Sequence, residues 1–275
     1  MQGAKKRFEE RGFRIASLSY DPVETLRVFG ERQHITFPML ADPGSGTIRA
    51  FGMIDPDNST DNVPQYGDKN TSYPGYFWIE RSGVVRERFV DAFWGDRRSG
   101  QSLLAAMFPE LVEKPAPRIK GAHLTLATGQ TDRVVSPGTR TTIFVDVALP
   151  KGMHLYAPGV DGYTPVSLEL DSLPYFEAPE PAVFPKAEVM RLEAIHETVP
   201  VFRGKVRIRQ DVFLPVKSAL LKFLGKDHAA TKPLEIRGKL KYQACSETVC
   251  YPPSELPVAW EFTAHPADFE RTMGK

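Results

Sequence analysis

The spacing of hydrophobic and polar positions changes near residue 114 of this chain. Before that point, short apolar runs typical of buried strands alternate with segments that have helical spacing. The expected helices are residues 1–11, 22–32, 45–51 and 99–108, and the expected strands are residues 13–19, 36–40, 76–79 and 84–89. Alternating strands and helices of this kind are typical of an α/β domain.

Beyond residue 114, helical spacing almost disappears. Apolar alternation predicts strands at residues 123–127, 140–149, 166–170, 205–214, 234–242 and 258–262. One short apolar segment, residues 218–224, could form a helix in a connection. Several strands separated by proline and glycine turns indicate an all-β sandwich.

The boundary between the two patterns is rich in proline. Pro115 and Pro117 stand one residue apart, which favours an extended, semi-rigid linker. We therefore expect an α/β domain at residues 1–113, a linker at 114–120, a β-sandwich at 121–264 and a C-terminal tail at 265–275.

Composition limits the classes of partner. The 275 residues are 41% hydrophobic and 25% charged, as in globular proteins, and 35 basic against 34 acidic side chains leave a formal charge of +1. A nucleic acid or an anionic membrane surface is therefore not expected as a partner. The longest apolar runs are far shorter than the roughly 20 residues that a membrane-spanning helix needs, so we expect no membrane insertion. The first 12 residues lack the apolar core of a secretory signal.

The chemistry of the chain is concentrated in its two cysteines, Cys245 and Cys250. In one extended strand they would lie roughly 16 Å apart on opposite faces. A disulfide requires the Cα atoms to be about 4.4 to 6.8 Å apart, so residues 246–249 must turn back for a bond to form. Four residues are enough for a hairpin loop.

Three alternatives are open for this pair. The cysteines form a redox-active disulfide, they form a disulfide that only stabilises the fold, or they remain two unpaired buried thiols. Closing a loop of about six residues removes only about 2 kcal/mol of unfolded-chain entropy. A disulfide here would therefore stabilise the fold only modestly. Strained or exposed disulfides are the ones that exchange readily. Pro252 and Pro253 follow Tyr251 and must lead the strand out of its sheet, which favours an exposed Cys250.

A metal site is not expected, and neither is a cofactor. A structural zinc site takes four cysteine or histidine ligands, and the chain has two cysteines. The six histidines show no ligand spacing with each other or with the cysteines. They are His34, His123, His154, His196, His228 and His265.

Several segments around the cysteines form one signature. They are Tyr242-Gln243-Ala244-Cys245, Cys250-Tyr251-Pro252-Pro253, Gly152-Met153-His154-Leu155-Tyr156, Thr164-Pro165 and Val183-Phe184-Pro185. Through them, residues 120–262 resemble the amino-terminal domain of DsbD, the bacterial thiol-disulfide interchange protein. The resemblance implies an immunoglobulin-like sandwich in the periplasm, which accepts electrons from a membrane-embedded reductase and passes them to thioredoxin-like client proteins.

The resemblance also assigns roles to single residues. Cys250 would attack the client and Cys245 would resolve the mixed disulfide, although spacing alone does not distinguish the two. Tyr156 matches a tyrosine that shields the active site, and His154 stands where a tyrosine is often found. Phe184 is the candidate for a shielding cap. Ordinary core packing is the alternative for Phe184 and Tyr156.

The first part of the chain carries a second resemblance. The segments concerned are Ala16-Ser17-Leu18-Ser19-Tyr20-Asp21, residues 35–43, residues 48–52 and Tyr73-Pro74-Gly75-Tyr76-Phe77-Trp78-Ile79. Residues 13–108 resemble the thioredoxin-fold peroxiredoxins of the AhpC/TSA type, an antioxidant family. Pro74 occupies the place where this fold often keeps a cis-proline beside its active site.

This part departs from the family because residues 1–244 contain no cysteine. A thiol peroxidase needs a thiolate, so no peroxidase activity is expected from the chain as written. The family's first strand and Cys motif would lie upstream of Met1. We expect Met1 to be an internal start, with an upstream segment that supplies the strand, the motif and an export signal.

These observations predict an extracytoplasmic thiol-disulfide oxidoreductase, or redox relay, that uses Cys245 and Cys250 beside a peroxiredoxin-like domain. The alternative is a non-catalytic binding module with a degenerate thioredoxin fold and a structural disulfide. Reactivity distinguishes the two, because a structural bond resists dithiol reductants.

Overall fold

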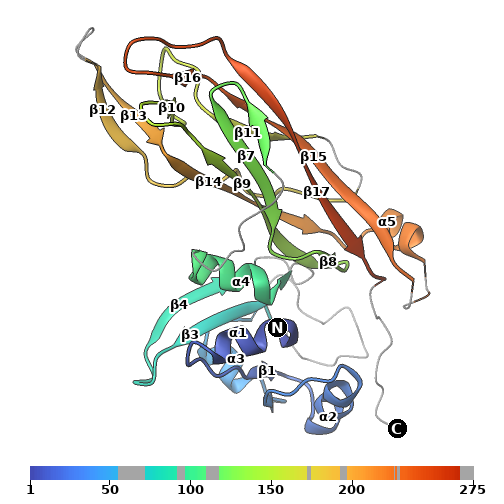
Figure 1. Ribbon diagram of the computed structural model, residues 1–275. Helices are drawn as coiled ribbons and strands as arrows, with labels where there is room; N and C mark the ends of the chain where they lie inside the picture. The colour runs from blue at the N-terminus through green and yellow to red at the C-terminus, as the bar shows by residue number, and fades with distance from the viewer. Residues whose placement is uncertain are drawn as a thin grey trace. The chain divides into compact units, whose positions relative to one another are not determined.

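The computed structural model describes residues 1–54, 72–91, 97–109, 118–171, 175–192, 197–225, 227 and 230–266 (Figure 1). Its internal contacts form two compact units, Met1–Met107 and Phe108–Pro266. The prolines of the expected linker, and residues 267–275 of the expected tail, lie outside the described residues.

The first unit alternates helices and strands, as its sequence pattern predicted. Its helices are η1 (Gln2–Ala4), α1 (Lys5–Glu9), α2 (Val23–Arg32), α3 (Gly46–Ala50) and α4 (Gly100–Met107). Its strands are β1 (Ser17–Ser19), β2 (Met39–Ala41), β3 (Gly75–Ile79), β4 (Val85–Val90) and β5 (Arg97–Arg98).

The strands β1 to β4 form two small sheets. β1 pairs with β2 in parallel, and β3 pairs with β4 antiparallel. No ladder joins the two pairs within the part of the chain that the structure describes. Leu18 and Leu40, directly opposite each other in β1 and β2, are 41% and 50% exposed. The α/β pattern is therefore present, but residues 1–54, 72–91 and 97–107 do not form one continuous sheet.

The second unit consists mainly of strands, in three sheets. Their orders are β11-β15-β17-β8, β14-β9-β7-β6 and β12-β13-β10-β16. The first sheet contains β8 (Val134–Val135), β11 (Ser167–Leu170), β15 (Lys232–Tyr242) and β17 (Ser254–Ala264). The second contains β6 (Ile119–Gly121), β7 (Leu124–Gln130), β9 (Thr139–Ala148) and β14 (Lys205–Leu214). The third contains β10 (His154–Tyr156), β12 (Glu188–Leu192), β13 (Glu197–Arg203) and β16 (Ala244–Cys245).

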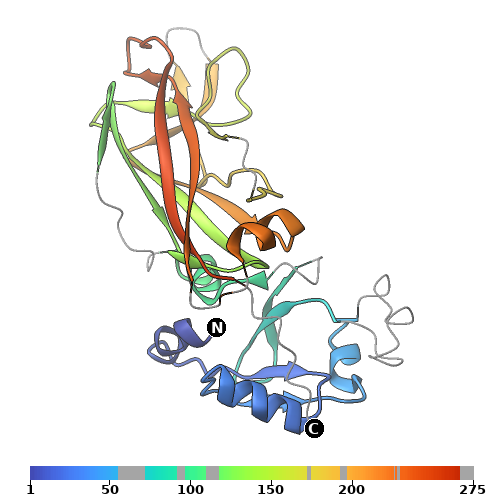
Figure 2. The ribbon, with the colours of Figure 1, turned by 90° about the vertical axis from the view of Figure 1, so that its right-hand side faces the viewer.

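One hydrophobic core joins these sheets. Along β15 and β17, buried and exposed side chains alternate, so each strand turns one face inward. Trp260 on β17 is 1% exposed, and its indole nitrogen donates a hydrogen bond to the Phe144 carbonyl of β9 at 3.3 Å. Figure 2 shows the orange-to-red pair β15–β17 as one layer, with the green strands of the other behind it. The predicted β-sandwich is confirmed at this level.

All six strands expected in this unit are present, and so is the short helix α5 (Ser218–Leu224). The expectations omitted β6, β8 and the whole sheet β12-β13-β10-β16. That omission matters because Cys245 lies on this sheet.

Candidate functional site

The third sheet has one face that packs into the main core and one that carries polar groups. Leu155, Phe202 and Ala244 point into the core. The alternate positions form a second cluster made of Tyr156, Met190, Val199, Val201 and Cys245. We call this second face the site face. His154 shares it, because it lies directly opposite Cys245 of β16, and Arg203 of β13 shares it because it lies directly opposite His154.

Cys245 and Cys250 form a disulfide across a tight hairpin. They are directly opposed antiparallel residues, with Cα atoms 4.0 Å apart. Hydrogen bonds close the hairpin on both sides of the bond, from the Ser246 amide to the Val249 carbonyl (2.8 Å) and from the Tyr251 amide to the Ala244 carbonyl (3.0 Å). The expectation that residues 246–249 turn back is confirmed.

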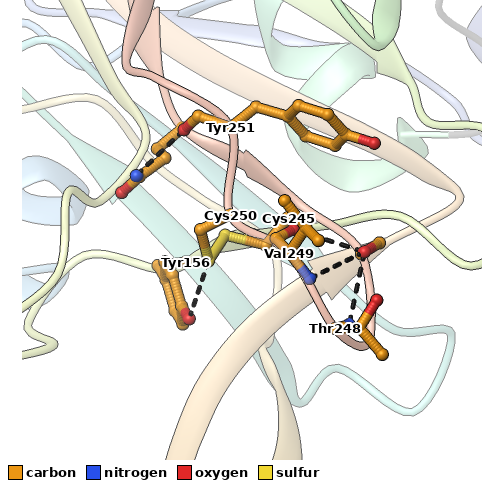
Figure 3. Close-up of a disulfide and its surroundings, with 8 residues drawn as sticks. Tyr156, Cys245, Thr248, Val249, Cys250 and Tyr251 are labelled. Atoms are coloured by element: carbon orange, nitrogen blue, oxygen red, sulfur yellow. Dashed lines mark hydrogen bonds between the residues drawn. A yellow bond between two sulfur atoms is a disulfide. The ribbon is translucent and has the colours of Figure 1, made fainter.

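Ser246 shapes this turn. Its hydroxyl oxygen accepts hydrogen bonds from the amides of Thr248 (3.3 Å) and Val249 (3.0 Å), as the dashed lines in Figure 3 show. A serine that bonds to amides two and three residues ahead stabilises a turn locally. The loop therefore holds its shape partly through the Ser246 side chain.

The two sulfur-bearing residues have different surroundings. Cys245 is 0% exposed, whereas Cys250 and its neighbour Val249 are exposed. A protein partner can therefore reach the Cys250 side of the bond and not the Cys245 side. Spacing in the sequence could not give this distinction.

Tyr156 contacts the accessible side of the bond. Its hydroxyl lies 3.6 Å from Cys250 Sγ (Figure 3), and because a disulfide sulfur carries no proton, the tyrosine is the donor. Burial, and secondarily the charge of Glu197, raise the pKa of Tyr156. The phenol is therefore protonated and available as a donor at neutral pH.

A second tyrosine covers the first. The Tyr163 ring lies 4.3 Å from that of Tyr156, centroid to centroid, and its hydroxyl donates to Glu197 at 2.8 Å. Tyr163 and Val160 pack against the cluster that contains Cys245. This hydrogen bond ties the connection between β10 and β11 to β13, beside the disulfide.

His154 is buried on the site face. It is 2% exposed, and its ring meets the Tyr156 ring edge to face at 5.5 Å. Burial, and then the positive charge of Arg203, lower the pKa of His154, while Glu247 acts in the opposite direction. The imidazole is therefore neutral at neutral pH.

The remaining candidates lie elsewhere. Phe184 stacks on Phe202 at 6.0 Å and packs against the main core, which is the packing alternative weighed for it. Its role as a cap stays a prediction. Pro74 belongs to the first unit, immediately before β3, where its carbonyl accepts a hydrogen bond from the Asp91 amide at 3.0 Å. Its assignment as a cis-proline beside an active site also stays a prediction.

The structure adds residues that the sequence did not indicate. The His123 ring stacks on Tyr251 at 3.7 Å, next to Cys250, and His123 adopts a left-handed backbone with φ of 62°. A non-glycine residue in this region is strained, and such residues often lie at functional sites. Neither His123 nor the Tyr163–Glu197 pair is close to the cysteines in sequence, so no local motif could reveal them.

The described residues offer neither a cluster of metal ligands nor a membrane-spanning helix. They contain no group of three or more histidine, cysteine or acidic side chains arranged to hold a metal ion. None of the helices described has the length and apolar character that a membrane crossing requires.

Comparison with known proteins gives two family matches on separate parts of the chain. Residues 1–88 match the AhpC/TSA family, and residues 124–259 match the N-terminal region of the thiol:disulfide interchange protein DsbD. Both resemblances found in the sequence are thereby confirmed.

Two plant proteins resemble the first part. The 1-Cys peroxiredoxin PER1 of Zea mays is 38% identical over 72 residues, which cover 21% of this chain and 31% of that protein. The 1-Cys peroxiredoxin A of Oryza sativa subsp. japonica is 29% identical over 69 residues, covering 22% and 31%. The chain thus spans about a third of the length of these relatives.

Solved structures resemble the second part at low identity. The DsbD N-terminal domain of Neisseria meningitidis in its reduced form has 19% identity and a TM-score of 0.29, covering 46% of this chain and 82% of that one. The N-terminal periplasmic domain of ScsB from Proteus mirabilis has 10% identity and a TM-score of 0.34, covering 53% and 49%. The chain therefore joins a segment similar to the AhpC/TSA family to a segment similar to the N-terminal region of DsbD.

Proposed function

We propose that this chain is an extracytoplasmic thiol-disulfide oxidoreductase that passes electrons through Cys245 and Cys250 to disulfide-bonded client proteins. The observation that carries the proposal is the asymmetry of the pair, one residue buried and the other exposed. An exchange protein needs one sulfur that a client can reach and a second that is kept from it. The DsbD match over residues 124–259 supports the same chemistry.

In the proposed reaction, the reduced pair donates two electrons to the client. The Cys250 thiolate attacks a sulfur of the client disulfide, and the client's other sulfur leaves as a thiolate. Cys245 Sγ then attacks Cys250 Sγ in the mixed disulfide, so the second client sulfur leaves as a thiolate. The client ends as a dithiol after taking up two protons, and the chain ends with the observed Cys245–Cys250 bond.

Tyr156 would assist at the accessible sulfur. Its hydroxyl, 3.6 Å from Cys250 Sγ, can donate a hydrogen bond to the Cys250 thiolate of the reduced pair before it attacks the client. A hydrogen bond to the charged form of a group favours that form. Tyr163, held by Glu197, would keep the Tyr156 ring in place and limit access of water to Cys245.

The wider assignments follow from the two family matches. We propose an immunoglobulin-like fold for the second unit, a thioredoxin-like fold for the first, and a periplasmic location in a bacterium. The partners would be a membrane-embedded reductase as electron donor and thioredoxin-like proteins as clients. Residues 1–244 contain no cysteine, so we propose no peroxide reduction for this part of the chain as written.

The proposal is tested by the reduction potential of the pair. The chain is equilibrated in glutathione and dithiothreitol buffers, free thiols are trapped, and the fraction reduced is measured by mass. We expect a potential between about −180 and −270 mV, the range of proteins that exchange disulfides. Because the chain has only two cysteines, each trapped thiol belongs to this pair.

The same titration tests the binding-module alternative. A structural staple is expected below about −300 mV, where glutathione buffers do not reduce it. That result would remove the proposed exchange reaction and leave a module with a structural disulfide.

A further inference from the structure

His154 is a buried titratable group for which the exchange reaction described above has no role. The side chain is 2% exposed, and its Nε2 atom is buried without a hydrogen-bond partner among the described residues. Burying a polar atom without a partner costs free energy, so such an atom in a site calls for an explanation. The explanation we find lies in the strand register.

His154 lies directly opposite Cys245 in the β10–β16 pair. Side chains of directly opposed antiparallel residues are on the same face, with Cβ atoms about 4.5 to 5.5 Å apart. Cys245 is 0% exposed, so bulk water does not reach its sulfur. The imidazole is therefore the titratable group that the register places against the buried cysteine.

We propose that His154 is the general base that takes the proton from the Cys245 thiol when this cysteine resolves the mixed disulfide. The inference rests on the proposed function and names the proton acceptor of its second step. The Cys245 S–H bond breaks as its proton moves to Nε2, and the sulfur's electron pair forms the bond to Cys250 Sγ. The Cys250–client bond breaks, and its electron pair leaves with the client sulfur. The imidazolium then returns its proton to that thiolate or to solvent.

The charges around His154 fit a base better than an acid. Arg203 faces it from β13 and Glu247 from the hairpin loop, and the Tyr156 ring packs against it from the same strand. Burial and Arg203 lower the pKa of His154, so its imidazole is neutral and can accept a proton at neutral pH. Transferring the proton inside the site avoids forming a buried thiolate, which burial disfavours.

Neighbouring groups are less suited to this role. The Tyr156 hydroxyl is directed at Cys250, and its raised pKa makes it a proton donor at neutral pH. Glu247 is exposed on the loop. His123 stacks on Tyr251, on the Cys250 side of the hairpin.

A two-phase assay of the full chain separates attack from resolution. The chain is reduced, desalted and mixed with one equivalent of the chromogenic disulfide dithiobis(nitrobenzoate). The first coloured thiolate reports attack by Cys250, and the second reports resolution by Cys245. In His154→Gln the first phase should keep its rate, while the second should slow by about a hundredfold, the lower end of what a positioned general base contributes.

The pH profile gives a readout that a structural role would not produce. In the unsubstituted chain, the second phase should be lost as the pH falls through the lowered pKa of His154, below the ordinary value of about 6.5. This follows because protonation removes the base. In His154→Gln the inflection should be absent, and His265→Gln, the same change elsewhere in the unit, should leave both phases unaltered. If His154→Gln does not fold, the pH dependence of the second phase in the unsubstituted chain still tests the role of His154.

The possible outcomes distinguish a failure of the role proposed for His154 from a failure of the proposed exchange reaction. Equal second phases in His154→Gln and the unsubstituted chain, or a second phase with no inflection on the acid side, would overturn the role of His154 and leave the exchange reaction intact. If the unsubstituted chain releases no first coloured thiolate, the exchange reaction itself is contradicted.

Discussion

Replacing Cys250 with serine is expected to abolish disulfide exchange, whereas Cys245→Ser should stop the reaction halfway, as a stable mixed disulfide. Cys250 is the exposed member of the pair, and Cys245 is 0% exposed. Without Cys250 no client can reach a sulfur. Without Cys245 the attack still occurs, but nothing resolves the adduct. Each variant is incubated with an oxidised thioredoxin-fold protein and examined by non-reducing electrophoresis and mass spectrometry.

The control is the unsubstituted chain, in which the adduct should be transient. A trapped adduct in Cys250→Ser and none in Cys245→Ser would reverse the roles assigned here. No adduct in either variant would contradict the assignment of both cysteines to exchange.

Trp260→Ala is expected to destabilise the second unit by about 3 to 5 kcal/mol, the usual cost of removing a large aromatic side chain from a core. Trp260 is 1% exposed, packs in the main core and donates a hydrogen bond to the Phe144 carbonyl. The change leaves a cavity in the core and removes the hydrogen bond that the indole donates to the Phe144 carbonyl. The free energy of unfolding is measured by urea titration followed by circular dichroism and by amide exchange of β9 and β15.

Trp260→Phe is the matched control, because it keeps a ring in the core and loses the hydrogen bond. It should cost clearly less than the alanine change. An average substitution lowers the free energy of unfolding by about 1 kcal/mol. If Trp260→Ala lowers it by less than this, the two sheets do not share the core described here.

The sandwich could be predicted from the sequence because buried positions recur at every second residue along most of β15 and β17. β14, β15 and β17 each contain ten or eleven residues, enough for period-two burial to stand out. The hairpin of the disulfide could also be predicted, because only a turn brings residues five positions apart within bonding distance.

The sheet that carries the site could not be predicted in the same way. β10 has three residues and β16 has two, too few to show a period. Pro200 interrupts the alternation of β13, and a proline within a run argues against a strand. These strands form because their inner residues, such as Leu155 and Phe202, complete the main core.

The site residues also divide into those that could be predicted from the sequence and those that could not. Resemblance indicated Tyr156, whose hydroxyl the structure places beside Cys250 Sγ. Tyr163 and Glu197 are 34 positions apart and meet only through the fold, so no spacing in the sequence connects them. The exposure of Cys250 was expected from Pro252 and Pro253, whereas the burial of Cys245 depends on the strands that pack around it.

Transfer of electrons from this chain to a client disulfide is the most direct measurement of the central claim. The reduced chain is mixed with an equal amount of an oxidised thioredoxin-fold protein, and the thiols of both are trapped and counted by mass over time. The account predicts that the client gains two thiols as Cys245 and Cys250 lose theirs, within the time that the free dithiol dithiothreitol needs for the same transfer. If the chain keeps both thiols while dithiothreitol reduces the client, the pair is not an exchange site.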